Sequence, residues 1–66
     1  MIVEILNTNK ELKVRKGQWY VAKSYWIDPD KVTLIQRISK KNLRNIGKEP
    51  MCNQYKSEVK VLNPSL

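Results

Sequence analysis

The side chains that most enzymes use for catalysis are scarce in this chain. Its 66 residues include no histidine, one cysteine, six acidic residues and two glycines. Without histidine there is no imidazole base and no Cys/His metal cluster, and two well-separated glycines cannot form a phosphate-binding loop. Asp28 and Asp30 are the one close acidic pair, and Pro29 between them favours a structural turn. We therefore expect a protein that is not an enzyme and that uses no metal or other cofactor.

Positive charge is the strongest compositional signal. Thirteen Lys and Arg against six Asp and Glu give a net charge of +7. A field of this size attracts polyanions, which include nucleic acid, an anionic membrane surface and an acidic protein. The basic residues fall on strand-like segments instead of one face of an amphipathic helix, so we do not expect a membrane partner. The abundance of Lys, Asn and Ile is what A/T-rich codons produce, and it suggests a phage or mobile element.

The candidate binding residues combine these cations with aromatic rings. Exposed rings offer stacking platforms worth about 1–3 kcal/mol per base, and cations neutralise phosphates. The alternatives are that the charges only solvate the surface and that the rings belong to the core. The expected platforms are Trp19 and Tyr25. The expected phosphate contacts are Lys13, Arg15, Lys16, Lys23 and Arg37, with Lys40, Lys41 and Arg44 as a second patch beside Arg37.

The stretch from residue 18 to residue 38 must position most of these side chains. Residues 19–27 and 32–38 are rich in β-branched and aromatic types and too short to prefer a helix. Between them, Pro29 presets φ for the second position of a type I turn, and the Asp28 side chain accepts hydrogen bonds from backbone N–H groups two residues on. We predict a β-hairpin with two antiparallel strands.

Lys23 stands in the middle of the first strand of this hairpin and sets its orientation. A lysine ammonium facing a small core needs a partner or a depressed pKa, so we expect Lys23 in water and its alternate neighbours in the core. A bulge near Ser24 is the alternative, because it would turn Tyr25 inward and Trp26 outward. The preferred assignment places Tyr20, Ala22 and Trp26 inside, and Trp19, Lys23 and Tyr25 outside.

Shorter segments complete the predicted set of strands. Gly17 is expected at the turn that follows residues 11–16. Residues 51–55 are expected to form one 3₁₀ turn, in which Cys52 is a small buried hydrophobic residue, since no histidine is present to activate it as a nucleophile. The strands are predicted at residues 2–6, 11–16 and 57–62, with Val3, Ile5, Leu12, Val14, Val59 and Val61 inward.

Residues 39–47 allow two structures. Ser39 as an N-cap and Gly47 at the end would suit a short helix, but Asn42 and Asn45 are poor helix formers and two turns are marginal. The competing structure is a second tight hairpin that turns at residues 40–42, with residues 43–46 as a short strand. We favour the hairpin, because turns between consecutive strands are the more common connection.

The length of the chain indicates one domain, which we place at residues 1–62, with a flexible C-terminal tail at residues 63–66. The lone cysteine cannot form an internal disulfide, which fits a reducing cytoplasm. The chain begins without a basic segment followed by an apolar run, and it contains no apolar stretch of about 18 residues. We therefore expect a soluble, cytoplasmic protein.

The order of these elements resembles the small SH3-like barrel. The resemblance covers residues 12–62 and rests on Gly17, Pro50, Tyr55 and the passage through a 3₁₀ turn into the final strand. The acidic loop and the paired tryptophans of the SH3 domains that bind proline-rich peptides are absent, so that activity is not expected. The resemblance implies an all-β, mostly antiparallel, five-stranded barrel with a short 3₁₀ turn before the last strand. Basic members of this group bind RNA, DNA or ribosomal and polymerase components.

Two functions follow from these observations. The first is sequence-tolerant binding of RNA or single-stranded DNA. The alternative is a protein-interaction module that docks on an acidic partner and modulates a host factor, because exposed aromatics beside Lys and Arg are also typical of interface hot spots. Short edge strands such as residues 2–6 can pair with a second copy, so the sequence leaves a homodimer open.

Overall fold

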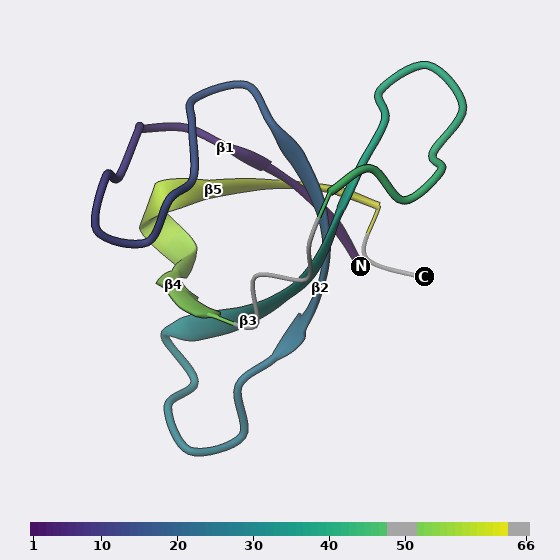
Figure 1. The fold of residues 1–66 in the computed structure, drawn as a ribbon. Helices are drawn as coiled ribbons and strands as arrows, with labels where there is room; N and C mark the ends of the chain where they lie inside the picture. Colours follow the sequence, from purple (N-terminus) through teal and green to yellow (C-terminus); the bar gives the residue numbers. More distant parts are fainter. Residues whose placement is uncertain (48–51, 64–66) are drawn as a thin grey trace.

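The chain folds into one antiparallel sheet of five strands (Figure 1). The computed structural model describes residues 1–47 and 52–63. Across the sheet the strand order is β4-β3-β2-β1-β5. The prediction of an all-β protein with five antiparallel strands and a 3₁₀ turn before the last is confirmed. The elements are β1 (Ile2–Ile5), β2 (Trp19–Ser24), β3 (Lys31–Ile38), β4 (Cys52–Tyr55), the 3₁₀ helix η1 (Lys56–Glu58) and β5 (Val59–Asn63).

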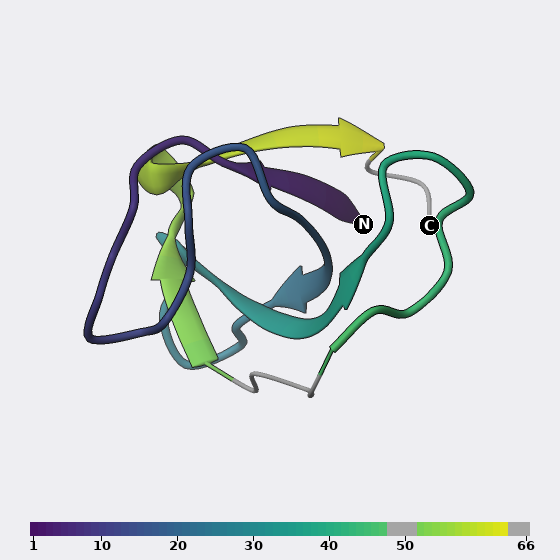
Figure 2. The same ribbon diagram turned by 45° about the horizontal axis from the view of Figure 1, so that its top comes forward.

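The sheet curls over one of its own faces, and the core lies on that concave side. In Figure 2, β1 and β5 lie above β3 and β4, with η1 joining the two layers at one side. This arrangement is compatible with a small barrel-like fold. Burial of each branched aliphatic side chain between the layers contributes about 1.5–3 kcal/mol. The buried cluster consists of Val3, Ile5, Val14, Tyr20, Ala22, Val32, Leu34 and Val59.

The predicted hairpin is formed by β2 and β3, and its turn has the predicted local cause. The Asp28 carboxylate accepts a hydrogen bond from the Asp30 backbone N–H at 2.9 Å, and the Lys31 N–H donates to the Asp28 carbonyl at 3.1 Å. Tyr20 and Ala22 are buried and Lys23 is exposed, as predicted. The orientation of β2 is therefore the one that the lysine in its middle requires.

Trp26 does not lie in the core, and this part of the prediction was wrong. Pairing of β2 with β3 ends at Ser24, so Trp26 falls in the connecting loop and its side chain is 87% exposed. The alternative placed Trp26 outward through a bulge near Ser24. The observed bulge lies elsewhere, because β3 has the extra residue Ile35 between the partners of Val21 and Ala22. Trp26 points outward because the strand ends early.

Replacing Trp26 with alanine is expected to leave the free energy of unfolding within about 0.5 kcal/mol of the starting value, since an exposed loop side chain supports no packing. A tryptophan buried in the core would cost about 3–5 kcal/mol on the same replacement. Urea denaturation followed by far-UV circular dichroism measures the difference. A loss above about 2 kcal/mol would show that Trp26 packs against the fold.

Residues 11–16 do not form the predicted strand. Both edges of β1 are paired, with β2 and β5, and both edges of β2 are paired, with β1 and β3, so neither of the strands that this segment connects offers it an edge. It forms a turn closed by a single bridge between Asn9 and Val14, with Lys13 in the left-handed region at φ 59°. Val14 is buried and Leu12 packs against the core, so the predicted inward side of the segment is confirmed. Gly17, at φ 89°, makes the expected turn.

The segment predicted as a 3₁₀ turn is strand β4. Cys52 pairs with Leu34, and the ladder continues to the pair of Tyr55 with Lys31. The free edge of β3 stabilises this extended conformation by supplying backbone partners, which the short segment could not reveal by itself. The 3₁₀ turn follows immediately, at η1.

Residues 39–47 adopt the hairpin and not the helix. The Leu43 N–H donates to the Ser39 carbonyl at 2.9 Å, and the Ser39 N–H donates to the Arg44 carbonyl at 2.8 Å. The predicted strand at residues 43–46 is reduced to one bridge, between Ile38 and Asn45. Leu43 has φ 58°, a conformation that interrupts regular pairing.

The last strand is placed close to the prediction. Val59 is buried as expected, but Val61 is exposed, because β5 lies at the edge of the sheet and only its first residue reaches the core. Asn63 belongs to β5, and the rest of the expected tail, residues 64–66, lies outside the described residues. Within residues 1–47 and 52–63, no helix has the length and apolar character needed to cross a membrane.

Candidate functional site

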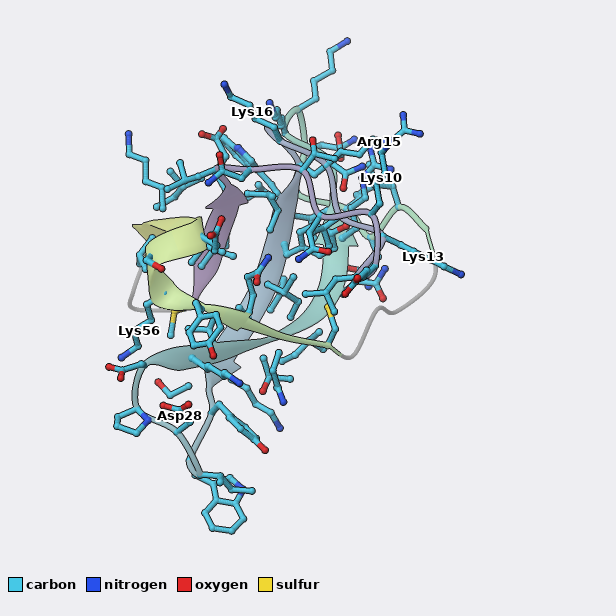
Figure 3. All side chains as sticks on the ribbon, turned by 90° about the vertical axis from the view of Figure 1, so that its left-hand side faces the viewer. Lys10, Lys13, Arg15, Lys16, Asp28 and Lys56 are labelled. Atoms are coloured by element: carbon cyan, nitrogen blue, oxygen red, sulfur yellow. The ribbon has the colours of Figure 1, made fainter. Side chains whose placement is uncertain are left out.

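Two connections at the same end of the sheet carry seven exposed cations. They are the long β1–β2 connection, residues 6–18, and the hairpin at residues 39–47, which lie on either side of the upper end of β2 in Figure 1. In Figure 3 the labelled side chains of the first connection project outward from it. We name this surface the cationic arc, and it consists of Lys10, Lys13, Arg15, Lys16, Lys40, Lys41 and Arg44.

The two halves of the cationic arc meet near Gly17. A Cβ atom placed on Gly17 would lie 3.5 Å from the Lys40 ammonium nitrogen. That nitrogen is 4.0 Å from a carboxylate oxygen of Glu4, and this is the one ion pair among residues 1–47 and 52–63. Six cations of the arc therefore have no acidic partner there, and their summed field is left available to an external polyanion.

Trp19 borders the cationic arc but is not a free stacking platform. Its indole N–H donates to the Glu4 carboxylate at 2.9 Å, and the side chain is partly buried. Trp19 lies six residues before Tyr25. Because a strand rises about 3.3 Å per residue, the two residues are about 20 Å apart along the strand. The predicted platforms are thus at opposite ends of β2.

Arg37 lies beside the hairpin of the predicted second patch, where its carbonyl accepts the Ile46 N–H, but it is half-buried and not fully exposed. In the sheet register it stands opposite Tyr20, on the core side, and its Nε atom is buried without a hydrogen-bond partner. Burial raises the pKa of the Tyr20 hydroxyl, and the positive charge of Arg37 opposes that rise. The Tyr20 hydroxyl donates to the Gln18 side chain at 2.9 Å. Arg37 therefore lies at the edge of the core, beside Tyr20.

Just past the far end of β2, three residues linked through the backbone combine two rings and a cation. Tyr25 donates its backbone N–H to the Lys31 carbonyl, and Lys31 pairs with Tyr55 on β4. The Lys31 ammonium lies 4.7 Å from the centre of the Tyr55 ring, and the Tyr55 side chain is 53% exposed. We name these three residues the aromatic row. Lys23, exposed on the adjacent row, extends it toward the cationic arc.

Sequence reasoning found most of the cations but missed part of both surfaces. Lys10 was not selected, although it lies in the same connection as Lys13. Lys31 and Tyr55 were missed because residues 51–55 were not read as a strand, so no register linked them to β3. Period-two alternation over so short a segment carries too little signal to reveal that pairing.

Cys52 is partly buried against the core, and burial raises the pKa of its thiol, which keeps it protonated and a poor nucleophile. Within residues 1–47 and 52–63 no three His, Cys, Asp or Glu side chains are grouped so that they could hold a metal ion.

Comparison of the chain with protein families, with curated proteins and with solved structures found no match.

Proposed function

We propose that this chain is a small SH3-like barrel that binds single-stranded nucleic acid, RNA or DNA, without strict sequence preference. The strand order β4-β3-β2-β1-β5 and the 3₁₀ turn between β4 and β5 support the SH3-like assignment. The cationic arc supports the choice of partner. It would contact the sugar–phosphate backbone, which is the same for every sequence.

The observation that carries the proposal is the arrangement of the cations. Seven positive side chains from two connections far apart in sequence lie along one end of a molecule that measures 30 × 28 × 18 Å. They form an extended arc instead of a compact pocket, which suits a linear polyanion better than a small anion. Each phosphate that the arc neutralises would release condensed counterions, and that release is a favourable contribution to binding.

The exposed rings favour a single strand over a duplex. The side chains of Trp26 and Tyr55 are exposed at the other end of β2. Bases stack on such rings only when they are unpaired and splayed, and every base has a face that can stack. A single strand could therefore use both ends of the molecule, whereas a duplex would use its phosphates alone.

The proposal is tested by titrating a labelled thymidine strand of about 12 nucleotides, within the range of about 4–16 nucleotides that an OB-fold barrel covers, at several salt concentrations. A single strand contributes about 0.7 to the salt slope per phosphate contact, so four to seven contacts predict a slope of roughly −3 to −5. Affinity should then fall about 50- to 1000-fold between about 50 mM and 200 mM salt.

A matched pair of double variants locates the contact. Lys16→Gln with Lys41→Gln removes two cations of the arc, and the expected result is a loss of about tenfold at 150 mM salt with a slope reduced by about 1.4. Lys56→Gln with Lys60→Gln removes the same charge outside the arc and should change affinity by no more than about twofold. Absence of binding at 50 mM salt, or equal effects of the two pairs, would overturn the proposal.

Docking on an acidic protein is the second candidate, and one observation favours it. Leu43 and Ile46 are exposed on the hairpin that carries Lys40 and Lys41, so apolar and cationic side chains share one surface there. Such a mixture is typical of protein interfaces. In a pull-down at physiological salt, nuclease treatment would release a partner bridged by nucleic acid and would retain a directly bound protein.

A further inference from the structure

We infer that the aromatic row, Tyr25, Lys31 and Tyr55, is a base-binding site for single-stranded nucleic acid. This inference rests on the proposed function and assigns the bases to a place separate from the cationic arc. The arc would hold phosphates at one end of β2, and the row would hold bases at the other, about 20 Å away along the strand. The two surfaces therefore perform different tasks and respond to different substitutions.

The geometry of Lys31 and Tyr55 supports this assignment. The ammonium group lies 4.7 Å from the ring centre, which is within cation–π range and restrains the ring on the sheet surface. About half of Tyr55 remains exposed. A base stacked on Tyr55 would thus have a cation beside it for its own phosphate. This pairing of a ring with a positive charge is complementary to the two parts of a nucleotide.

Neighbouring residues extend the site along the strand. Lys23 is exposed next to the row, and its register partner on β3 is Thr33. The Thr33 hydroxyl donates a hydrogen bond to the Asn53 side chain at 2.7 Å. Trp26 follows Tyr25 in the loop and offers a third ring, almost fully exposed. Exposed rings of this size bury large apolar areas when a partner covers them. The sheet surface between the rings is ordered by its own hydrogen bonds, so little would have to rearrange on binding.

Acidic groups beside the row distinguish a base from a purely anionic ligand. Asp28 and Asp30 lie in the adjoining loop, and their two carboxylates offset two of the three cations there, Lys23, Lys31 and Lys56. The Asp28 carboxylate is partly engaged by the Asp30 N–H, and the Asp30 carbonyl accepts the Lys56 N–H at 2.8 Å. The net charge of these groups is +1, against seven cations in the cationic arc, so an acidic peptide would be attracted much less strongly to this end. Stacking must supply the affinity.

The test uses the whole chain and compares the thymidine strand with a sugar–phosphate strand of equal length that lacks bases. Tyr55→Leu keeps apolar bulk but removes the ring, and the expected result is a 5- to 150-fold weaker affinity for the thymidine strand, about the value of one stacked base. The salt slope should not change, because no phosphate contact is lost. Tyr55→Phe should restore affinity to within about twofold, since the stacking face is retained.

Further variants separate the inference from the proposed function. For the base-free strand, Tyr55→Leu should have no effect, while Lys16→Gln with Lys41→Gln should still weaken binding. Val61→Ala, an exposed apolar residue on β5, is the control and should leave both affinities unchanged. If both strands bind equally, or if Tyr55→Leu binds the thymidine strand like the unmodified chain, the base-binding site is refuted and the arc stands. If neither strand binds at low salt, both proposals fall. Urea unfolding of each variant confirms that it is folded.

Discussion

Replacing Leu34 with alanine is expected to lower the free energy of unfolding by about 2–5 kcal/mol. Leu34 is 0% exposed in the centre of β3, and its register partners are Ala22 on β2 and Cys52 on β4. Removing its side chain loses the transfer free energy and leaves a cavity that a tightly curled sheet cannot close. A domain of this size has a total stability of about 3–10 kcal/mol, so the variant should lose a large fraction of it.

Urea denaturation measured by circular dichroism checks this expectation, and Leu43→Ala is the matched control. Leu43 is the same residue type, but it is half exposed at the tip of the hairpin. Its replacement should change stability by less than about 0.5 kcal/mol. Similar unfolding midpoints for the two variants would show that the core does not centre on β3.

Replacing Gln54 with methionine is expected to stabilise the protein by about 1–3 kcal/mol. Gln54 is 4% exposed, its register partner is the fully buried Val32, and its Nε2 atom is buried without a hydrogen-bond partner. A buried amide nitrogen without a hydrogen-bond partner has lost its hydration without compensation. Methionine has a similar length and flexibility and no group that requires hydration.

Gln36→Met is the control for this prediction, because the same substitution should have the opposite sign. Gln36 is also buried, but its Nε2 atom donates to the Gly47 carbonyl at 2.9 Å. The same atom also donates to the Arg37 carbonyl at 3.3 Å, and loss of the two bonds should destabilise the protein by about 0.5–1.5 kcal/mol for each. Thermal and urea unfolding of both variants measure the difference. A destabilised Gln54→Met variant would contradict the interpretation of that amide as an uncompensated polar group.

The β2–β3 hairpin was predictable because its causes are local. The turn depends on the Asp28 side chain and on Pro29, and the orientation of β2 depends on the unfavourable burial of Lys23. The same period-two reasoning correctly identified Val14 as buried although its segment is not a strand. In this segment, the alternation of apolar residues predicted which side chains are buried, although it did not predict whether a strand forms.

Strand formation itself depended on which edges were free to pair. Residues 11–16 have strong alternation but find the edges of β1 and β2 occupied, whereas the weakly patterned β4 pairs with the free edge of β3. That pairing creates the aromatic row by setting Tyr55 beside Lys31. Neither residue by itself indicates that Tyr55 and Lys31 lie side by side, because the two are far apart in the chain.

The amino-acid sequence by itself determined the all-β class, the position of the main hairpin, the exposure of Lys23 and the excess of positive charge. These follow from side-chain size, turn chemistry and the cost of burying a charge, all of which act within a few residues. Only the tertiary structure decided that Trp26 lies in a loop and that Arg37 is half-buried on the core side of β3. It also decided that the cations and the exposed rings occupy opposite ends of β2. Those outcomes depend on hydrogen bonding between segments distant in sequence, and competition for strand edges is settled by the whole sheet.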